Sequence, residues 1–330
     1  MGYDKLILSR ATERLGRDKE RRLEVFSRRQ AALTAQLPEL AELDRALRGT
    51  VTRVIAAALS AGEDPAPAVE EQRKKNLALQ ARRAELLRSA GYDPASLDPS
   101  PACPRCGDSG WTAGGMCDCL KKLCIEEQAK ELSKLLDVGS QSFATFNLSY
   151  YSTIPGESGR SPRETMERVL SSCRDYADNF SAGAKKNLYL YGNTGLGKTF
   201  LSAAIAKQVA ARGFSVVYDT ATNIFAQFEQ QKFSRDVGES QDAKDETRRY
   251  LKCDLLIVDD LGSEFATPFV QSALYTLVNS RLVSGGGTVI SSNLTMVDAE
   301  KRYSPQVLSR LKGEYKMLPF VGDDIRLLKK

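Results

Sequence analysis

The sequence predicts an α/β fold class: a three-layer α/β/α domain preceded by an α-helical N-terminal region and a small cysteine-rich segment. Residues 1–100 are rich in Ala, Leu, Arg and Glu, which favour helices. From about residue 160, short apolar runs alternate with helical patterns, as in a sheet covered by helices. A glycine-rich octet stands between one such run and a helix. We expect a helical region over 1–100, a cysteine segment over 101–136, a linker over 137–159 and the α/β domain over 160–330.

The N-terminal region is expected to form a helical hairpin or a three-helix unit. Apolar residues from Val51 to Leu59 recur at helical spacing, and leucine patterns predict a helix before and after them. Pro38 and the stretch 62–67 separate the three patterns. Charge-laced helices of this kind usually present solvated faces, with a docking surface for another protein as the alternative.

Composition excludes several classes of protein. The 330 residues suffice for two domains, and no apolar run reaches the ~18 residues of a membrane span. The N-terminus lacks the apolar segment of a signal peptide, so we expect a cytoplasmic protein with no membrane partner. Histidine is absent, which excludes Ser-His-Asp and Cys-His hydrolases and HExxH metalloproteases. The net charge of +5 permits contact with nucleic acid without requiring it.

Five of the seven cysteines lie within residues 103–124. In a chain expected in the cytosol this clustering favours a metal over disulfides. Two short pairs joined by a glycine-rich turn suit a tetrahedral, structural Zn²⁺ site; the predicted ligands are Cys103, Cys106, Cys117 and Cys119. Cys124 is the alternative fourth ligand, and a redox pair or no metal are the other interpretations. Cys173 and Cys253 are expected to fill the core.

Four short runs are predicted to form parallel strands, because near-continuous apolar sequence is typical of strands covered on both faces. They are 187–191, 214–218, 255–258 and 288–292. We expect the strand 214–218 to lie between the two strands that carry the glycine-rich octet and the acidic pair described below.

The glycine-rich octet matches the phosphate-binding loop G-x-x-x-x-G-K-[ST] and stands between a strand and a helix. Its glycines allow backbone N–H groups to surround a polyphosphate, and Lys198 adds a charge for the β- and γ-phosphates. The Thr199 hydroxyl suits Mg²⁺. The nucleotide-binding set, extended by one residue into the helix, is Gly192, Asn193, Thr194, Gly195, Leu196, Gly197, Lys198, Thr199 and Phe200. The sequence therefore predicts binding of ATP or ADP with Mg²⁺.

Polar residues follow two further strands. Asp259 and Asp260 directly follow the run 255–258, and ligands bind at this end of the strands in open α/β sheets. Asp259 is expected to hold Mg²⁺, as in Walker B motifs, and Asp260 to orient or deprotonate the attacking water. Asn293 ends the strand 288–292 and is predicted to contact the γ-phosphate or the water, although an isolated Asn there is more often a turn residue.

These motifs together resemble the AAA+ ATPases of the DnaC/DnaI helicase-loader group. The resemblance rests on GNTGLGKT, DLLIVDDLGSE, VISSNLT, QVLSRLKG and the terminal DDIR, with ACPRCGDSG and CDCLKK upstream. It covers roughly residues 101–330, while residues 1–100 match only in general character. It implies an AAA+ P-loop NTPase fold and a slow ATPase that binds single-stranded DNA and delivers the hexameric replicative helicase.

The resemblance also assigns two arginines and an assembly. It implies that Arg310 is an arginine finger reaching the ATP of a neighbouring subunit in an ATP-dependent oligomer, and that Arg326 is the sensor-2 arginine. Many AAA+ proteins carry Glu at the position of Asp260, so the shorter side chain fits a slow switch, with Glu264 as a candidate helper.

Two other functions stay open from sequence. One is an IstB-like transposition helper ATPase that acts on duplex DNA with a transposase, and the other is a nucleotide-binding regulator that never hydrolyses ATP. For DNA contact the sequence offers the segment 230–252, whose alternative interpretation is a solvated loop; the basic residues expected to contact DNA are Lys232, Arg235, Lys244, Arg248 and Arg249.

Overall fold

The computed structural model describes residues 3–60, 66–97, 100–135, 141–156, 159–183 and 187–328. Two compact units divide the chain: residues 13–117 form one, and residues 1–12 with 118–330 form the other. The four-part division expected from the sequence stays a prediction. None of the helices in the described ranges is long and apolar enough to cross a membrane.

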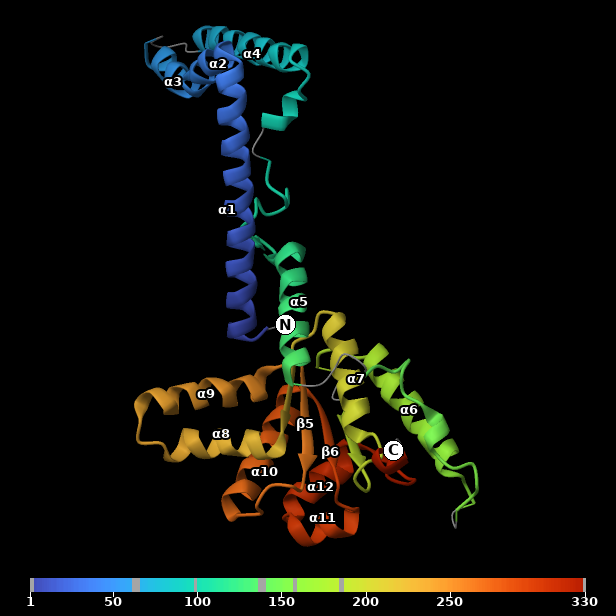
Figure 1. Cartoon of the computed structure of the whole chain (residues 1–330). Coiled ribbons are helices and arrows are strands. Elements are labelled where there is room, and N and C mark those ends of the chain that lie inside the picture. The colour runs from blue at the N-terminus through green and yellow to red at the C-terminus, as the bar shows by residue number, and fades with distance from the viewer. Residues whose placement is uncertain are drawn as a thin grey trace. The chain divides into compact units, whose positions relative to one another are not determined.

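Most of the first unit consists of helices (Figure 1). Its elements are α1 (Lys5–Gln36, from residue 13 onward), α2 (Pro38–Arg48), α3 (Thr50–Ser60), α4 (Ala66–Ser89) and the short helix η1 (Pro94–Leu97). Pro38 occupies the first turn of α2, where its missing N–H costs nothing, so this proline starts a helix instead of only separating two. Most of the predicted break at 62–67 lies outside the described residues.

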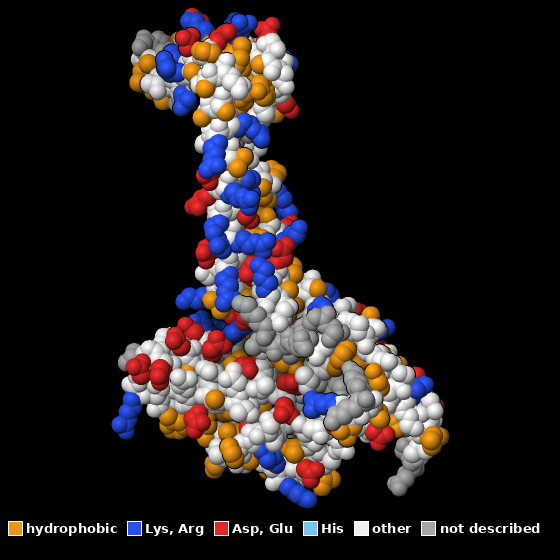
Figure 2. Space-filling model, in the orientation of Figure 1, with side chains coloured by type: hydrophobic (Ala, Val, Ile, Leu, Met, Phe, Trp, Pro, Cys, Tyr) orange, Lys and Arg blue, Asp and Glu red, His pale blue; other side chains and the backbone are white. Residues whose placement is uncertain are grey.

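A small apolar cluster and a largely buried ion pair hold these helices together. Leu33, Leu40, Leu87 and Leu97 form the cluster. Beside it, Arg83 pairs with Asp44 at 2.7 Å and also donates to the carbonyl of Leu97. Basic side chains outnumber acidic ones along α1, nine to four, and Figure 2 shows side chains of both signs exposed along this helix.

A cysteine-rich hairpin follows the helices. It contains β1 (Trp111–Thr112) and β2 (Gly115–Met116), which pair antiparallel, and α5 (Asp118–Leu135) begins directly after Cys117.

The second unit contains a five-stranded parallel sheet with the order β4-β5-β6-β3-β7. The strands are β3 (Asn187–Tyr191), β4 (Val216–Thr220), β5 (Leu255–Leu261), β6 (Gly287–Ser292) and β7 (Lys316–Pro319). The helices are α6 (Pro162–Asp178), α7 (Lys198–Ala211), α8 (Ala221–Phe233), α9 (Val237–Lys252), α10 (Pro268–Ser284), α11 (Met296–Arg302), α12 (Pro305–Glu314), α13 (Ile325–Leu328) and the short η2 (Leu148–Tyr150).

Helices cover both faces of the sheet, which confirms the predicted three-layer class. Alternate strand residues enter two separate cores, for example Ile257 on one face and Val258 on the other. The first core includes α6 and α7, and the second includes α8, α10 and α12. Cys173 and Cys253 are buried in these cores, as expected.

The expected position of one strand is wrong. β4 lies at the edge of the sheet, and β6 separates β3 from β5. Strands that follow one another in sequence need not be neighbours in a doubly wound sheet, because the crossover through α10 brings the chain back between β5 and β3. β7, a four-residue strand that ends in a proline, was not predicted from the sequence.

The free edge of β4 is covered by α5. The side-chain amide of Gln128 donates to the carbonyl of Phe214 at 2.8 Å and accepts from the N–H of Val216 at 3.0 Å. Gln128 is buried, so it acts as the hydrogen-bonding partner that an edge strand lacks.

Candidate nucleotide site

The glycine-rich octet forms a tight loop between β3 and α7. Gly192 and Gly195 have φ angles of +145° and +76°, which residues with a side chain rarely adopt. Both glycines also lie against the C-terminal segment: a Cβ at Gly192 would come within 2.3 Å of the Phe320 carbonyl, and one at Gly195 within 1.8 Å of the Asp324 carboxylate. The loop therefore needs glycine for contact as well as for conformation.

Lys198 is the first residue of α7 and is buried. Its ammonium group donates to the carbonyls of Gly192 at 2.7 Å and Asn193 at 2.6 Å, so the lysine lies along its own loop. Burial lowers its pKa from 10.5 to about 8, while the nearby Asp260 and Asp259 act in the opposite direction.

The acidic pair lies at the end of β5, next to the start of α7. The Thr199 hydroxyl lies 3.3 Å from Oδ1 of Asp259, so the two predicted Mg²⁺ ligands come together. Tyr218 donates to Oδ2 of Asp259 at 2.7 Å, and Ser291 donates to Oδ1. A carboxylate beside a hydroxyl is a donor set that suits Mg²⁺.

A β-bulge in β5 orients the side chain of Asp260. Val258 pairs with Ile290 and Leu261 with Ser292, so β5 has one residue more than β6 in this interval. Val258 and Leu261 both enter the second core, and Asp260 adopts φ +58° between them. In a regular strand Asp260 would lie on the face opposite Asp259. At the bulge its carboxylate instead accepts a hydrogen bond from the side-chain amide of Asn293.

The structure brings Arg326 to this site. The residue before it, Ile325, donates its N–H to the carbonyl of Gly195 at 3.1 Å. The charge of Arg326 is among the causes that lower the pKa of Lys198. The C-terminal segment therefore packs on the phosphate-binding loop, and the sensor-2 role of Arg326 stays a prediction.

Arg310 lies elsewhere. It belongs to α12, and its guanidinium group lies over the Tyr275 ring of α10, 5.5 Å from the ring centroid. A finger that serves a neighbouring subunit need not contact its own ATP site, so its role stays a proposal.

Two neighbours of the loop were not predicted from the sequence. Tyr151 is buried and donates to the carbonyl of Leu196 at 2.8 Å. The Phe146 ring packs on Tyr151 and on Phe200. The aromatic residues in 143–151 were the available signal, but that segment was expected to be a linker.

Glu264 makes structural contacts, and its helper role stays a prediction. Its carboxylate accepts from the N–H of Gly262 at 2.7 Å and from the hydroxyl of Tyr303 at 2.5 Å, and it lies 3.6 Å from Arg302. These contacts fix the loop after β5 to α11.

The four predicted zinc ligands lie together. The sulfur atoms of Cys103, Cys106, Cys117 and Cys119 are all within 4.8 Å of one another. Four thiolates at this spacing fit a closed, structural Zn²⁺ site. Cys124 does not belong to this group, and burial raises its pKa to about 11, which disfavours the thiolate that a metal requires.

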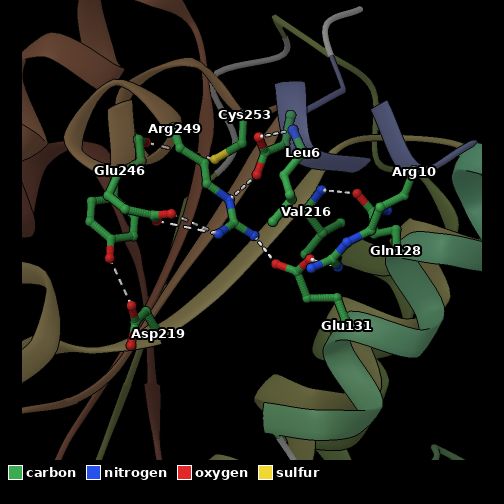
Figure 3. A network of polar contacts seen from close by, with 11 residues as sticks. Leu6, Arg10, Gln128, Glu131, Val216, Asp219, Glu246, Arg249 and Cys253 are labelled. Atoms are coloured by element: carbon green, nitrogen blue, oxygen red, sulfur yellow. Dashed lines mark hydrogen bonds and ion pairs between the residues drawn. The ribbon is translucent and has the colours of Figure 1, made fainter. Parts of the chain in front are cut away.

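Arg249, one of the predicted DNA contacts, lies in a buried ionic network. Figure 3 shows its guanidinium group between the carboxylates of Glu131 and Glu246. Asp4 also pairs with it, and the side chain is only 17% exposed. Arg249 therefore joins α9 to α5 and to the start of α1, whereas its neighbour Arg248 is exposed.

Comparison with known families places these features in context. Residues 168–330 match the model of a family described as IstB-like ATP binding protein. The replicative helicase loader DnaC of Escherichia coli (strain K12) is 25% identical over 149 residues, which cover 45% of this chain and 59% of DnaC. The replicative helicase loader DnaI of Bacillus subtilis (strain 168) is 31% identical over 119 residues, which cover 34% of this chain and 35% of DnaI.

The solved structures similar to this chain include the DnaC helicase loader, with a TM-score of 0.46 and 18% identity over 56% of this chain and 99% of that one. A crystal structure of DnaI has a TM-score of 0.44 and 21% identity, over 57% of this chain and 92% of that one.

Proposed function

Residues 168–330 form an IstB/DnaC-like AAA+ domain, and from this premise we propose that the protein is an ATP-dependent loader of the hexameric replicative helicase. One observation carries the proposal: a phosphate-binding loop, an acidic strand end and an Asn meet at one edge of the sheet in a domain whose relatives are named helicase loaders. The match spans only part of each relative, so the activity of the whole protein is part of the proposal.

The residues of the loop bind the triphosphate. Backbone N–H groups from Gly192 to Thr199 surround it, and Lys198 leaves its own loop carbonyls to contact the β- and γ-phosphates. Thr199 and Asp259 would hold Mg²⁺, which would neutralise phosphate charge. Phe200 packs behind the loop against Phe146.

Hydrolysis needs an oriented water molecule. The bulge directs Asp260 towards Asn293, so the carboxylate and the amide act on the same water, the first as acceptor of its proton and the second as a hydrogen-bond partner. Arg326 contributes positive charge from the same subunit, and Arg310 contributes it from the neighbouring subunit of an ATP-dependent oligomer. Asp260 and Asn293 both have short side chains, which favours slow turnover.

The N-terminal helices and the cysteine hairpin provide the surface for the helicase. Zn²⁺ held by the four cysteines stabilises the hairpin without an open coordination position, so its role is structural. Single-stranded DNA contacts the α8–α9 segment through exposed basic residues such as Arg248, and not through Arg249.

A transposition helper that acts on duplex DNA with a transposase is the second candidate, favoured by the description of the matching family. The clustered cysteines upstream of the AAA+ domain favour the loader, because these cysteine motifs are part of the resemblance to the helicase-loader group.

Co-purification with the replicative helicase of the same organism tests the proposal. The full chain is mixed with the helicase and ATP, and the complex is separated by size-exclusion chromatography with light scattering. We expect a complex of defined stoichiometry, formed by wild type and weakened in Lys198→Ala. No complex with the helicase, together with ATP-dependent binding to duplex DNA, would support the transposition helper instead.

A further inference from the structure

A buried tyrosine from the edge strand reaches the predicted magnesium carboxylate. Tyr218 lies on β4 and is 5% exposed, and its hydroxyl donates to Oδ2 of Asp259 at 2.7 Å. The residue that pairs with Asp259 across the sheet is Thr220, so the tyrosine side chain extends along β4 to meet the carboxylate. None of the motifs in the sequence includes this residue.

Asp259 is held by hydroxyl groups from three different elements. Tyr218 of β4 occupies Oδ2, whereas Ser291 of β6 and Thr199 of α7 contact Oδ1. These three donors are neutral, so they fix the carboxylate without cancelling its charge. A carboxylate that is fixed and still negative is what a divalent cation needs.

The two oxygens of this carboxylate differ in their surroundings. Oδ1 lies beside the Thr199 hydroxyl, at the start of the phosphate-binding helix. Oδ2 lies in the buried layer below, against the phenol of Tyr218. Rotation of the carboxylate would break the phenol bond, so the tyrosine keeps Oδ1 on the side of Thr199.

We infer that Tyr218 is a positioning residue for the ATPase reaction: its phenol orients Asp259 so that Oδ1 and the Thr199 hydroxyl hold Mg²⁺ together. The inference rests on the proposed ATP–Mg²⁺ site. Burial, followed by the charge of Asp259, raises the pKa of Tyr218, so the phenol keeps its proton and donates throughout the working pH range. No proton is transferred.

The chain contains a matched control. Tyr250 is also buried, and its hydroxyl donates to the carboxylate of Asp219 at 2.8 Å. Asp219 is the next residue of β4 after Tyr218, and Figure 3 shows it in the polar network around Arg249. Tyr250→Phe therefore removes another tyrosine–carboxylate bond from the same strand, one that is partly buried and lies away from the phosphate-binding loop.

The test compares wild type, Tyr218→Phe and Tyr250→Phe as full chains. Two quantities are measured for each: the Mg²⁺ concentration that gives half-maximal ATP turnover, and the affinity for a fluorescent ADP with Mg²⁺ and with EDTA. We expect Tyr218→Phe to raise the Mg²⁺ requirement about fivefold, the equivalent of one net hydrogen bond, and to leave the affinity in EDTA unchanged. Tyr250→Phe is expected to match wild type in both, although both variants lower the melting temperature.

A wild-type Mg²⁺ requirement in Tyr218→Phe overturns the inference, as does an equal shift in Tyr250→Phe, because the effect would then be structural. If wild type hydrolyses no ATP, the proposed function fails, and the gain in ADP affinity on adding Mg²⁺ still decides the role of Tyr218. Should Tyr218→Phe not fold, Ser291→Ala removes a donor from the other oxygen of Asp259 and is expected to shift the Mg²⁺ requirement in the same direction. An unshifted requirement in that variant contradicts the account.

Discussion

The fold lowers the pKa of Lys198, the lysine of the phosphate-binding loop. It is buried among loop carbonyls, and its pKa is lowered to about 8. A polyphosphate beside the ammonium group favours the charged form and raises this pKa again. Nucleotide binding near neutral to alkaline pH is therefore linked to uptake of a proton.

The first prediction concerns this linkage. Above pH 8 free Lys198 is increasingly neutral, while the bound state keeps its proton, so the affinity for ATP should fall as pH rises from about 8 to 10. Isothermal titration calorimetry in buffers with different ionisation enthalpies measures the uptake directly. Lys198→Arg, which stays charged, is the control and should take up no proton. A wild-type affinity that is constant across this range would contradict the lowered pKa.

Arg249 carries a second prediction at the residue scale. Its removal leaves Asp4, Glu131 and Glu246 without their shared cation in a mostly buried network, so Arg249→Ala should destabilise the second unit by roughly 3–5 kcal/mol. The exposed neighbour Arg248 is the matched control. Arg248→Ala should leave the urea midpoint unchanged and weaken binding of single-stranded DNA in a salt-dependent way. The account is wrong if the two variants exchange these effects.

The elements of the second unit show how a parallel sheet is closed at its edge. Among the strands that the structure describes, β4 pairs only with β5, and Gln128 of α5 supplies hydrogen bonds on its other side. A helix that covers an edge strand prevents pairing with another chain.

The third prediction follows from this cover. Gln128→Leu leaves the carbonyl of Phe214 and the N–H of Val216 without partners, so it should cost about 2–4 kcal/mol of unfolding free energy. Hydrogen exchange at Val216 should become faster in the variant. Lys122→Leu, at an exposed position of α5, is the control and should change neither quantity. Unchanged exchange at Val216 in Gln128→Leu would show that α5 does not protect the strand.

The sequence predicted elements better than their arrangement. Apolar runs and glycine spacing identified β3, β5, β6 and α7, since these signals are local. The bulge at Asp260 and the contact of Asp324 with Gly195 could not be predicted, because they depend on neighbours from distant parts of the chain. Strand order also depends on distant parts of the chain, and for this reason the predicted position of β4 was wrong.

At the scale of the whole molecule, the proposed ATPase reaction requires more than one subunit. The site in a single chain contains Lys198, Asp259 and Asn293, whereas Arg310 lies over Tyr275 on another surface. An arginine supplied by the next subunit would make hydrolysis depend on assembly.

The fourth prediction separates these two contributions. Arg310→Ala should bind ATP like wild type but lose turnover by at least about 100-fold, as expected for an arginine that acts in trans. Lys198→Ala should bind no ATP but still present Arg310. Mixing the two inactive variants should therefore restore part of the turnover. No recovery over a range of ratios would mean that Arg310 serves its own subunit or only packs on Tyr275.

The central claim is that ATP bound at this loop controls delivery of the replicative helicase to single-stranded DNA. Its most direct measurement is the amount of purified helicase loaded on circular single-stranded DNA, with the full chain, Mg²⁺ and ATP. The account predicts that wild type increases loading several-fold over helicase alone, and that Lys198→Ala and Asp259→Ala do not. Loading that is unaffected by the wild-type protein, or equal for wild type and Lys198→Ala, would contradict it.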